Sequence, residues 1–317
     1  MKVLVTGGTG YLGRAIVRAV TARGHEPVVF ARSASRSGLP GRLVDGDIRD
    51  RAALRAAAIG CDAVCHSAAV VSVWRRRRAD FDEVNVGGLE NVLDAAADLG
   101  LGRIVYTSSF LALPPDGAAE PLQANDYQRT KVLADRRARE AALRGVPILC
   151  MYPGVIYGPG LPTEGNLVGR MIADHLARRL PGVIGADCVW SYAFVDDVAD
   201  GHVLALQRGR VGEAYALGGE NAPQMRAFEI VRDQTGRPLP RRIPSVVARA
   251  VGFAELGRVN LLGGSPLLTP GTVTILESDW PLDSGPAERD LGYRARPLLA
   301  GLTQTIADLT STAGSIK

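Results

Sequence analysis

The sequence predicts an α/β fold, a doubly wound parallel sheet with a smaller carboxy-terminal lobe interleaved with it. In the first half, short β-branched runs alternate with amphipathic stretches of ten or more residues, which is typical of βαβ units. The short runs are almost continuously apolar, as expected for strands buried on both faces of a sheet. After Pro153 glycine and proline become frequent and the alternation stops, which indicates a second lobe.

The alternation predicts each element in turn. Strands are expected at 2–7, 27–32, 42–47, 62–68, 103–109 and 146–153, and helices at 13–24, 51–60, 79–100 and 127–145. Residues 212–219 are expected to add one more strand to the main sheet. We therefore predict a first domain over 1–155, with return segments near 190–218, and a lobe formed mainly by 156–317. The segment 246–264 carries few charges, and core packing of the lobe explains it more simply than contact with an apolar substrate.

The composition excludes several classes of protein. The net charge is only +4, so no nucleic-acid partner is expected. The amino terminus lacks the apolar core of a signal peptide, and the longest apolar stretch is broken by Asp62 and His66, so no membrane partner is expected. The four cysteines form no CxxC pair, which argues against both zinc and disulfides. We expect a cytoplasmic, metal-free protein.

A glycine-rich loop joins the first expected strand to the first expected helix. "TGGTGYLG" places Gly7, Gly10 and Gly13 in GxxGxxG spacing, which differs from the GxGxxG of ordinary Rossmann dehydrogenases. Such a loop brings backbone close to a dinucleotide pyrophosphate at the positive end of a helix. A tight turn that needs glycine only for its backbone angles is the simpler alternative. The position of the loop favours a Rossmann-type cofactor site.

The end of the second expected strand indicates which cofactor binds. An NAD site usually has a carboxylate there for the ribose hydroxyls, whereas an arginine accommodates the 2′-phosphate of NADP. This strand ends in Arg32, with Arg36 close behind and no carboxylate at the tip. Arg32 could simply be solvated, but the pattern favours NADP over NAD.

Tyr127 and Lys131 stand four residues apart in "NDYQRTKVLAD" and would share one face of a helix. By itself this spacing is ordinary for a surface pair. A lysine that made a tyrosine more acidic would instead create a proton donor and acceptor. The choice between the two depends on the rest of the chain.

The motifs TGGTGYLG, GDIRD, HSAA, NVGGLENV, YTSS, YQRTK, PGVIYGPG and FVDDVA occur in that order. Together they make the chain resemble an extended short-chain dehydrogenase/reductase of the NAD-dependent epimerase/dehydratase type, over nearly its whole length. "VYTSS", "GEAYALGGEN" and the "DLGYRARPLLAGLTQTI" ending are most similar to the branch of dihydroflavonol reductases and 3β-hydroxysteroid dehydrogenases.

The resemblance implies roles for individual residues. Tyr127 would be the catalytic acid/base, and Lys131 would lower its pKa and hold the nicotinamide ribose. Ser109 would bind the reacting oxygen, with Ser108 and Thr107 as alternatives. Asn85 would support the neighbouring helix and sheet. The cofactor would contact the glycine loop, the end of the second strand and the edges of later strands, through Gly7, Gly10, Tyr11, Leu12, Gly13, Arg32, Asp47, Ile48, His66, Ser67, Ala68, Ala69, Lys131, Tyr152, Pro153 and Val155.

Departures from the family pattern narrow the chemistry. Tyr152 stands where relatives usually have arginine, and Phe110 and Leu111 stand where dehydratases carry an Asp-Glu pair, so dehydration is set aside. The run Arg75 to Arg78 is typical of a solvated loop, although it could clamp an anionic substrate. Asp196 and Asp197 are better explained by a helix amino terminus than by a metal site.

These observations favour an NADP-dependent oxidoreductase that moves a hydride between nicotinamide and a ketone or alcohol of a small-molecule substrate. A nucleotide-sugar epimerase with tightly bound NAD is the second interpretation, and a non-catalytic NADP sensor the third. The resemblance further implies a homodimer formed through helices around 83–99 and 127–143.

Overall fold

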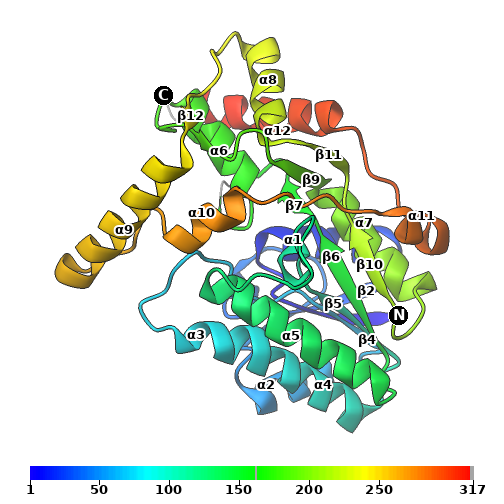
Figure 1. Cartoon of the computed structure of the whole chain (residues 1–317). Helices are drawn as coiled ribbons and strands as arrows, with labels where there is room; N and C mark the ends of the chain where they lie inside the picture. Colours follow the sequence, from blue (N-terminus) through cyan, green and yellow to red (C-terminus); the bar gives the residue numbers. More distant parts are fainter. Residues whose placement is uncertain (161–162, 315–317) are drawn as a thin grey trace.

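A computed structural model describes residues 1–160 and 163–314, with side chains placed to residue 311. Its centre is a sheet of seven parallel strands in the order β10-β6-β5-β4-β1-β2-β3 (Figure 1). The strands are β1 (Lys2–Thr6), β2 (Glu26–Ala31), β3 (Arg42–Asp45), β4 (Ala63–His66), β5 (Arg103–Thr107), β6 (Ile148–Pro153) and β10 (Ala214–Leu217). The predicted fold class and the late strand near 212–219 are both confirmed.

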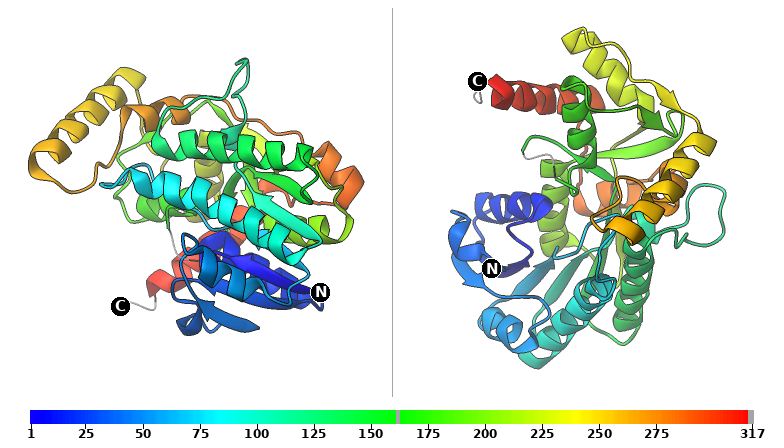
Figure 2. Two further views of the ribbon diagram at one scale, coloured as in Figure 1. Left: turned by 90° about the horizontal axis from the view of Figure 1, so that it is seen from below. Right: turned by 90° about the vertical axis from the view of Figure 1, so that its left-hand side faces the viewer.

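Helices cover both faces of this sheet. Helices α1 and α7 pack together on one face, and α2, α4 and α5 lie on the other (Figures 1 and 2). The helices of this part are α1 (Tyr11–Ala22), α2 (Arg51–Ala58), α3 (Ala79–Phe81), α4 (Gly88–Leu99), α5 (Asp126–Leu143) and α7 (Val195–Arg208). Alternate strand residues serve the two cores: Val3 and Val5 join the α1/α7 core, whereas Leu4 joins the other.

The second lobe has small sheets of its own. The three-stranded sheet has the order β11-β9-β7 and the two-stranded sheet pairs β12 with β8. Its elements are β7 (Val155–Tyr157), α6 (Leu167–Leu176), β8 (Val183–Ile184), β9 (Val189–Phe194), β11 (Glu220–Pro223), α8 (Gln224–Thr235), β12 (Arg242–Ile243), α9 (Ser245–Leu262), α10 (Pro270–Leu276), α11 (Gly285–Leu291) and α12 (Leu298–Gly314). Sequence periodicity did not reveal these short strands.

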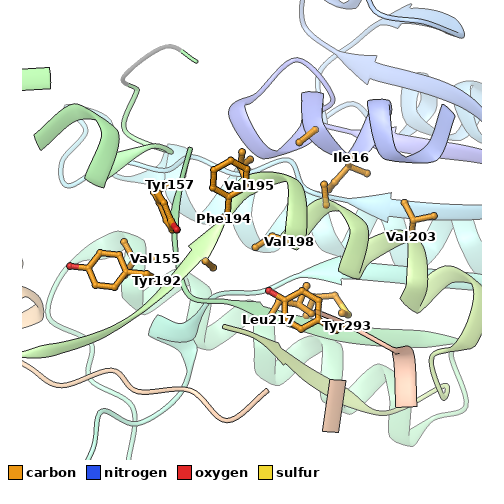
Figure 3. Packing of buried hydrophobic residues seen from close by; sticks show 14 of the residues in the cluster. Ile16, Val155, Tyr157, Tyr192, Phe194, Val195, Val198, Val203, Leu217 and Tyr293 are labelled. Atoms are coloured by element: carbon orange, nitrogen blue, oxygen red, sulfur yellow. The ribbon is translucent and has the colours of Figure 1, made fainter. Parts of the chain in front are cut away.

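Aromatic side chains join the two lobes into one core. Tyr157 of β7 packs edge-on against Phe194 of β9, with ring centroids 5.5 Å apart, and Val195 and Val198 continue the cluster along α7 (Figure 3). Because α7 packs on α1 and its own chain enters from β9, this core fixes the second lobe relative to the glycine loop.

The helix expected at 79–100 is interrupted by one wide turn. The π-helical segment η2 (Asp82–Gly87) lies between α3 and α4. A π-helical turn shifts the register of the following side chains and is often found at functional sites. Here it carries Asn85, whose contacts are described below. No residue pattern in the sequence indicated it.

The prediction that residues 246–264 are core is wrong. Helix α9 extends away from the body of the molecule (Figures 1 and 2), and only Ala248, Gly252 and Val259 of it are buried. Its apolar residues follow helical spacing on the outer side as well as the inner side, and composition by itself does not distinguish the two.

Candidate active site

The glycine loop leads into the amino terminus of α1, whose first backbone amides have no capping side chain. Its N-cap is Gly10, which offers no side chain to the first turn, and no acidic residue lies in that turn. In contrast, α2, α5, α6 and α10 are capped by Asp50, Asn125, Asn166 and Thr269. An anionic group can therefore bind the exposed amides of α1, and a dinucleotide pyrophosphate fits this site.

The glycines are also required by close packing. Gly7 has a φ of 68°, and a Cβ there would lie 2.6 Å from Cα of Ala68. A Cβ on Gly13 would overlap the carbonyl of Gly7. At Gly10 the nearest atom would be 3.2 Å away. The tight-turn explanation thus accounts for Gly7 and Gly13, and Gly10 is the glycine whose absent side chain chiefly leaves the helix end open.

The segment after β2 presents cations and no free carboxylate. Arg32 and Arg36 are exposed. Asp45, at the neighbouring end of β3, accepts hydrogen bonds from the backbone and hydroxyl of Ser35 at 2.8 and 2.6 Å. The pKa of Asp47 is lowered to about 2, first by its hydrogen bond from Arg49 and also by Arg32. Both acidic groups near the tip are therefore already engaged.

Hydrogen bonds distinguish the three hydroxyls that follow β5. Thr107 contacts His202, with Oγ1 and Nε2 2.9 Å apart, and Ser108 donates to Asp135 at 2.9 Å. Ser109 turns the other way, towards Tyr127, and its hydrogen bond lowers the pKa of that phenol. This arrangement favours Ser109 over its two neighbours as the residue beside the tyrosine.

The expectation that Lys131 makes Tyr127 more acidic does not hold in this structure. Burial raises the pKa of Tyr127 to about 12, and the hydrogen bond with Ser109 offsets only part of that rise. Burial lowers the pKa of Lys131 to about 8, while Asp135 opposes the change. Its Nζ instead donates to the backbone carbonyl of Thr107 at 2.9 Å. Desolvation therefore outweighs the charge of the lysine at this tyrosine.

A buried histidine that the sequence did not single out supports this lysine. His202 of α7 has its Nδ1 2.8 Å from the carbonyl of Val198, so Nδ1 carries the proton and Nε2 accepts from the hydroxyl of Thr107. Burial lowers the pKa of His202 to about 4, which keeps the ring neutral. Thr107 is thus held by its side chain while its carbonyl accepts from Lys131. Thr107 and His202 lie 95 residues apart, so no local sequence pattern predicted their contact.

Asp135 forms a second buried support on α5. It accepts hydrogen bonds from Ser108, from the hydroxyl of Tyr152 at 2.7 Å and from Arg139 at 2.8 Å. The hydroxyl of Tyr152 is therefore engaged with Asp135. The sequence predicts Tyr152 to be among the residues that contact the cofactor. In the structure its hydroxyl is already bonded to Asp135 and Arg139.

The remaining predicted cofactor residues fall into two groups. Ser67 donates its hydroxyl to the carbonyl of Thr6 at 2.8 Å, and Ala68 packs on Gly7, so this strand end adjoins the glycine loop with Ala69 following it. Ile48 contacts Gly88 and is buried. The others lie in or against the hydrophobic core, namely Tyr11, Leu12, Pro153 and Val155.

His66 lies beneath the site. Its Nδ1 is 2.7 Å from the hydroxyl of Thr6, whereas its buried Nε2 has no hydrogen-bond partner among the described residues. Burial, with a smaller effect of Lys131, lowers its pKa to about 3. A neutral imidazole next to the cofactor cleft offers one unused polar atom.

Asn85 and two arginines hold the amino-terminal end of α5. Asn85 accepts from the amide of Val70 at 2.8 Å and donates to Thr130 at 2.9 Å. Arg78 binds Asp126, and Arg129 binds Asp82, each through two hydrogen bonds. The expected supporting role of Asn85 fits these contacts.

The arginine run 75–78 is divided between two environments. Arg77 pairs with Asp80 and Glu83, and Arg78 with Asp126, whereas Arg75 and Arg76 form no ion pair with any residue that the structure describes. These exposed pairs contribute little stability. The half of the run nearest α5 is therefore occupied by carboxylates and is not free to clamp an anion.

A cavity of about 460 Å³ lies between the segment before α5 and the second lobe. Its walls come from residues 122–124, α9 and α10, and they are mainly apolar: Leu122, Gln123, Ala124, Arg249, Phe253, Pro270, Gly271 and Thr274. Because Ala124 lies three residues before Tyr127, the cavity adjoins the tyrosine-bearing end of α5.

The geometry agrees with sequence comparison. The profile of the NAD dependent epimerase/dehydratase family matches residues 3–218, which include the glycine loop, Ser109, Tyr127 and Lys131. The chain belongs to this family. Its curated relatives are named as reductases and dehydrogenases, and the chain is an NAD(P)-dependent enzyme of the extended short-chain dehydrogenase type.

Several relatives match along almost the full chain. Sterol demethylase protein B of Methylococcus capsulatus is 30% identical over 97% of this chain and 98% of its own. A putative dihydroflavonol 4-reductase of Synechocystis is 31% identical over 96% and 92%. The 3 beta-hydroxysteroid dehydrogenase/Delta 5-->4-isomerase of Mycobacterium tuberculosis is 31% identical over 92% and 85%. The predicted similarity to this branch of the family is confirmed.

Solved structures share the fold. The crystal structure of gox2253 superposes with a TM-score of 0.82 at 28% identity and covers 98% of each chain. A UDP-glucose-4-epimerase from Stenotrophomonas maltophila with bound NAD gives a TM-score of 0.77 at 25% identity over 99% of each chain. Members with different reactions therefore share this scaffold, and the reaction depends on the site.

Two further observations bear on partners. Among residues 1–160 and 163–314, no group of three or more His, Cys, Asp or Glu side chains is placed to hold a metal ion. Asp197 instead binds Arg296, with a shortest distance of 2.7 Å. Within the same residues, no helix has the length and apolar character needed to cross a bilayer.

Proposed function

We propose that this family member is an NADP-dependent reductase of a ketone carried on an apolar skeleton, working reversibly on the corresponding alcohol. The observation that carries the proposal is that Tyr127 shares a hydrogen bond with Ser109 and stands one helical turn before Lys131, at the end of α5 that adjoins an apolar cavity. A binding protein without catalysis has no chemical need for these three residues together.

The nicotinamide would supply or accept the hydride at the substrate carbon. Tyr127, with a pKa of about 12, is protonated at neutral pH and can donate its proton to the oxygen that becomes the alcohol. The Ser109 hydroxyl, next to that phenol, can donate a hydrogen bond to the same oxygen as charge develops on it. Lys131, with a pKa of about 8, is mostly charged at pH 7 and can donate a hydrogen bond to the nicotinamide ribose.

The chain's own groups support NADP. The free amides of α1 can bind the pyrophosphate, and Arg32 can pair with a 2′-phosphate because no neighbouring carboxylate is available to compete for a ribose hydroxyl. We further propose that residues 1–155, with the return segments near 190–218, bind the cofactor, and that 156–317 mainly bind the substrate. A cytoplasmic homodimer formed through α4 and α5 remains part of this proposal.

The cavity supports an apolar substrate. Leu122, Phe253 and Pro270 are among the apolar residues of its wall, and its volume suits a small molecule. Relatives are named for alkyl or steroid ketone chemistry, such as the 2-alkyl-3-oxoalkanoate reductase of Stenotrophomonas maltophilia, 30% identical over 92% of this chain. These names guide the choice of trial ketones.

Replacing Tyr127 by Phe tests the assignment. We expect turnover of a panel of alkyl ketones and hydroxysteroids with NADPH to fall at least about 100-fold, since general acid catalysis contributes about 10² to 10⁴ in rate. Cofactor affinity, followed by NADPH fluorescence, should stay nearly unchanged. Equal turnover in the Tyr127→Phe variant would refute the catalytic role.

A nucleotide-sugar epimerase is the second candidate, because neighbours with this fold carry out that reaction. It would retain its NAD and show no net turnover of cofactor. Denaturing freshly purified protein and identifying the released nucleotide separates the two: a preparation free of nucleotide that prefers NADPH supports the reductase, whereas retained NAD(H) would favour the epimerase. The engaged state of Arg77 and Arg78 counts against a diphosphate clamp.

A further inference from the structure

Helix α9 exposes a continuous apolar stripe to solvent. Residues at spacings of three and four along the helix, which share one face, are all exposed and none is charged: Val246, Ala250, Phe253, Ala254, Gly257 and Leu261. Val246 is 79% exposed and Leu261 is 85% exposed, on the side opposite buried Ala248 and Val259. A surface helix normally turns such a stripe towards the core, so this one is built to meet an apolar phase or partner.

Apolar exposure continues past the end of the helix. Leu262 is 81% exposed, and Leu267, in the loop that leads to α10, is 88% exposed. Both lie at the end of the element that extends furthest from the body of the molecule (Figures 1 and 2). Among the described residues, the exposed large apolar side chains are therefore concentrated in this one projection.

The charges beside the stripe select the kind of partner. Residues 236–268 contain five arginines and a single acidic residue, Glu255. Arg242, Arg249 and Arg258 pair with Asp187, Glu277 and Glu255, whereas Arg237 and Arg241, just before the helix, form no ion pair with any described residue. A second copy of the chain would bring an equally cationic surface and no complementary charge. An anionic lipid surface offers both an apolar layer and the opposite charge.

We propose that α9 and the loop to Leu268 form a docking surface that lies on an anionic lipid bilayer without crossing it. The sequence-based expectation of no membrane partner considered only a spanning segment, and peripheral binding needs none. Phe253 lies both on the stripe and in the wall of the cavity, so the docked helix places that cavity next to the lipid, from which an apolar substrate can enter. The proposed docking surface is inferred from exposed apolar side chains and from arginines that are unpaired within the described chain, and it does not depend on the proposed reductase activity.

Sedimentation of the full chain with vesicles tests the proposal. We expect binding to vesicles of phosphatidylcholine mixed with phosphatidylglycerol, much weaker binding to phosphatidylcholine alone, and weakening as salt is raised. The double variant Val246→Ser/Leu261→Ser should bind roughly tenfold or more weakly, because it removes two of the most exposed apolar side chains of the stripe. Both positions lie outside the cavity, so turnover of a water-soluble ketone should not change.

Controls make each outcome decisive. Leu143→Ser on α5 removes a leucine that is 90% exposed elsewhere, and it should bind vesicles like the unaltered protein. Arg237→Gln/Arg241→Gln, which removes two charges without an ion pair among the described residues, should reduce binding only to the anionic vesicles. Absence of vesicle binding, equal binding by the Val246→Ser/Leu261→Ser variant, or a dimer in light scattering that this variant converts to monomer would each overturn the proposal.

Discussion

Replacing Lys131 by Met should stabilise the folded protein at neutral pH while abolishing turnover. Lys131 is only 4% exposed, and burial lowers its pKa from 10.5 to about 8. At about 1.4 kcal/mol per pH unit, this lowering of the pKa corresponds to roughly 3 kcal/mol by which the folded state disfavours the charged lysine. Methionine avoids that cost at a similar volume. Loss of the hydrogen bond to the carbonyl of Thr107 costs about 1 kcal/mol of stability, so the net stabilisation is about 2 kcal/mol.

The stability difference between Lys131→Met and the unaltered protein should depend on pH in a definite direction. Between about pH 8 and 10.5 the unfolded chain keeps the Lys131 proton and the folded chain has lost it, so the stability of the unaltered protein rises with pH in this window. The advantage of Lys131→Met should be constant below pH 8 and then shrink by about 1.4 kcal/mol per pH unit. Near pH 10.5 it should disappear or reverse slightly, because only the lost hydrogen bond remains.

Urea denaturation at pH 7 and at pH 9.5 measures both quantities. Lys2→Met is the matched control, since Lys2 is partly exposed, pairs with Glu26 and should change stability by no more than about 0.5 kcal/mol. A Lys131→Met variant that is less stable than the unaltered protein at pH 7 would refute the reasoning. So would an advantage that does not change between the two pH values.

Three further substitutions test the rest of the site. Ser109→Ala should lower turnover about 100-fold or more, whereas Ser108→Ala should cost about 1 kcal/mol of stability and little activity; similar effects on turnover would contradict the choice of hydroxyl. Arg32→Gln should weaken NADPH binding about 10- to 100-fold and leave NADH binding unchanged, as fluorescence titration can show. Thr107→Val should destabilise the protein by about 1–3 kcal/mol, because the acceptor nitrogen of His202 loses its donor. Its turnover should fall less than tenfold, since the carbonyl that holds the lysine remains, and a larger loss would show that the hydroxyl itself takes part.

The sequence predicted the main sheet well because most of its strands are short, mainly apolar runs between clear turn signals. It also predicted that the strand near 212–219 would return to the sheet, although more than fifty residues separate it from β6. The short strands β7, β9 and β11 were missed because they are held by pairing between distant segments, which a local pattern does not contain. The π-helical turn at Asp82–Gly87 was missed for the same reason.

At the site, residue identity was easier to predict than residue environment. Spacing and order singled out Ser109, Tyr127 and Lys131, but not that Tyr127 has a raised pKa or that His202 supports Thr107. Those properties depend on which elements pack around a group. A pKa in particular results from burial and charge together, and the sequence shows only the charges.

The raised pKa of Tyr127 is consistent with a reductase. A phenol with a pKa of about 12 is a poor base at neutral pH, and it holds the proton that carbonyl reduction requires. The reverse reaction, alcohol oxidation, needs the phenolate and should therefore accelerate as pH rises. The raised pKa of Tyr127 thus favours reduction at neutral pH and oxidation at alkaline pH. The pH–rate profiles in both directions, measured with a ketone and alcohol pair that the cavity accepts, can test this asymmetry.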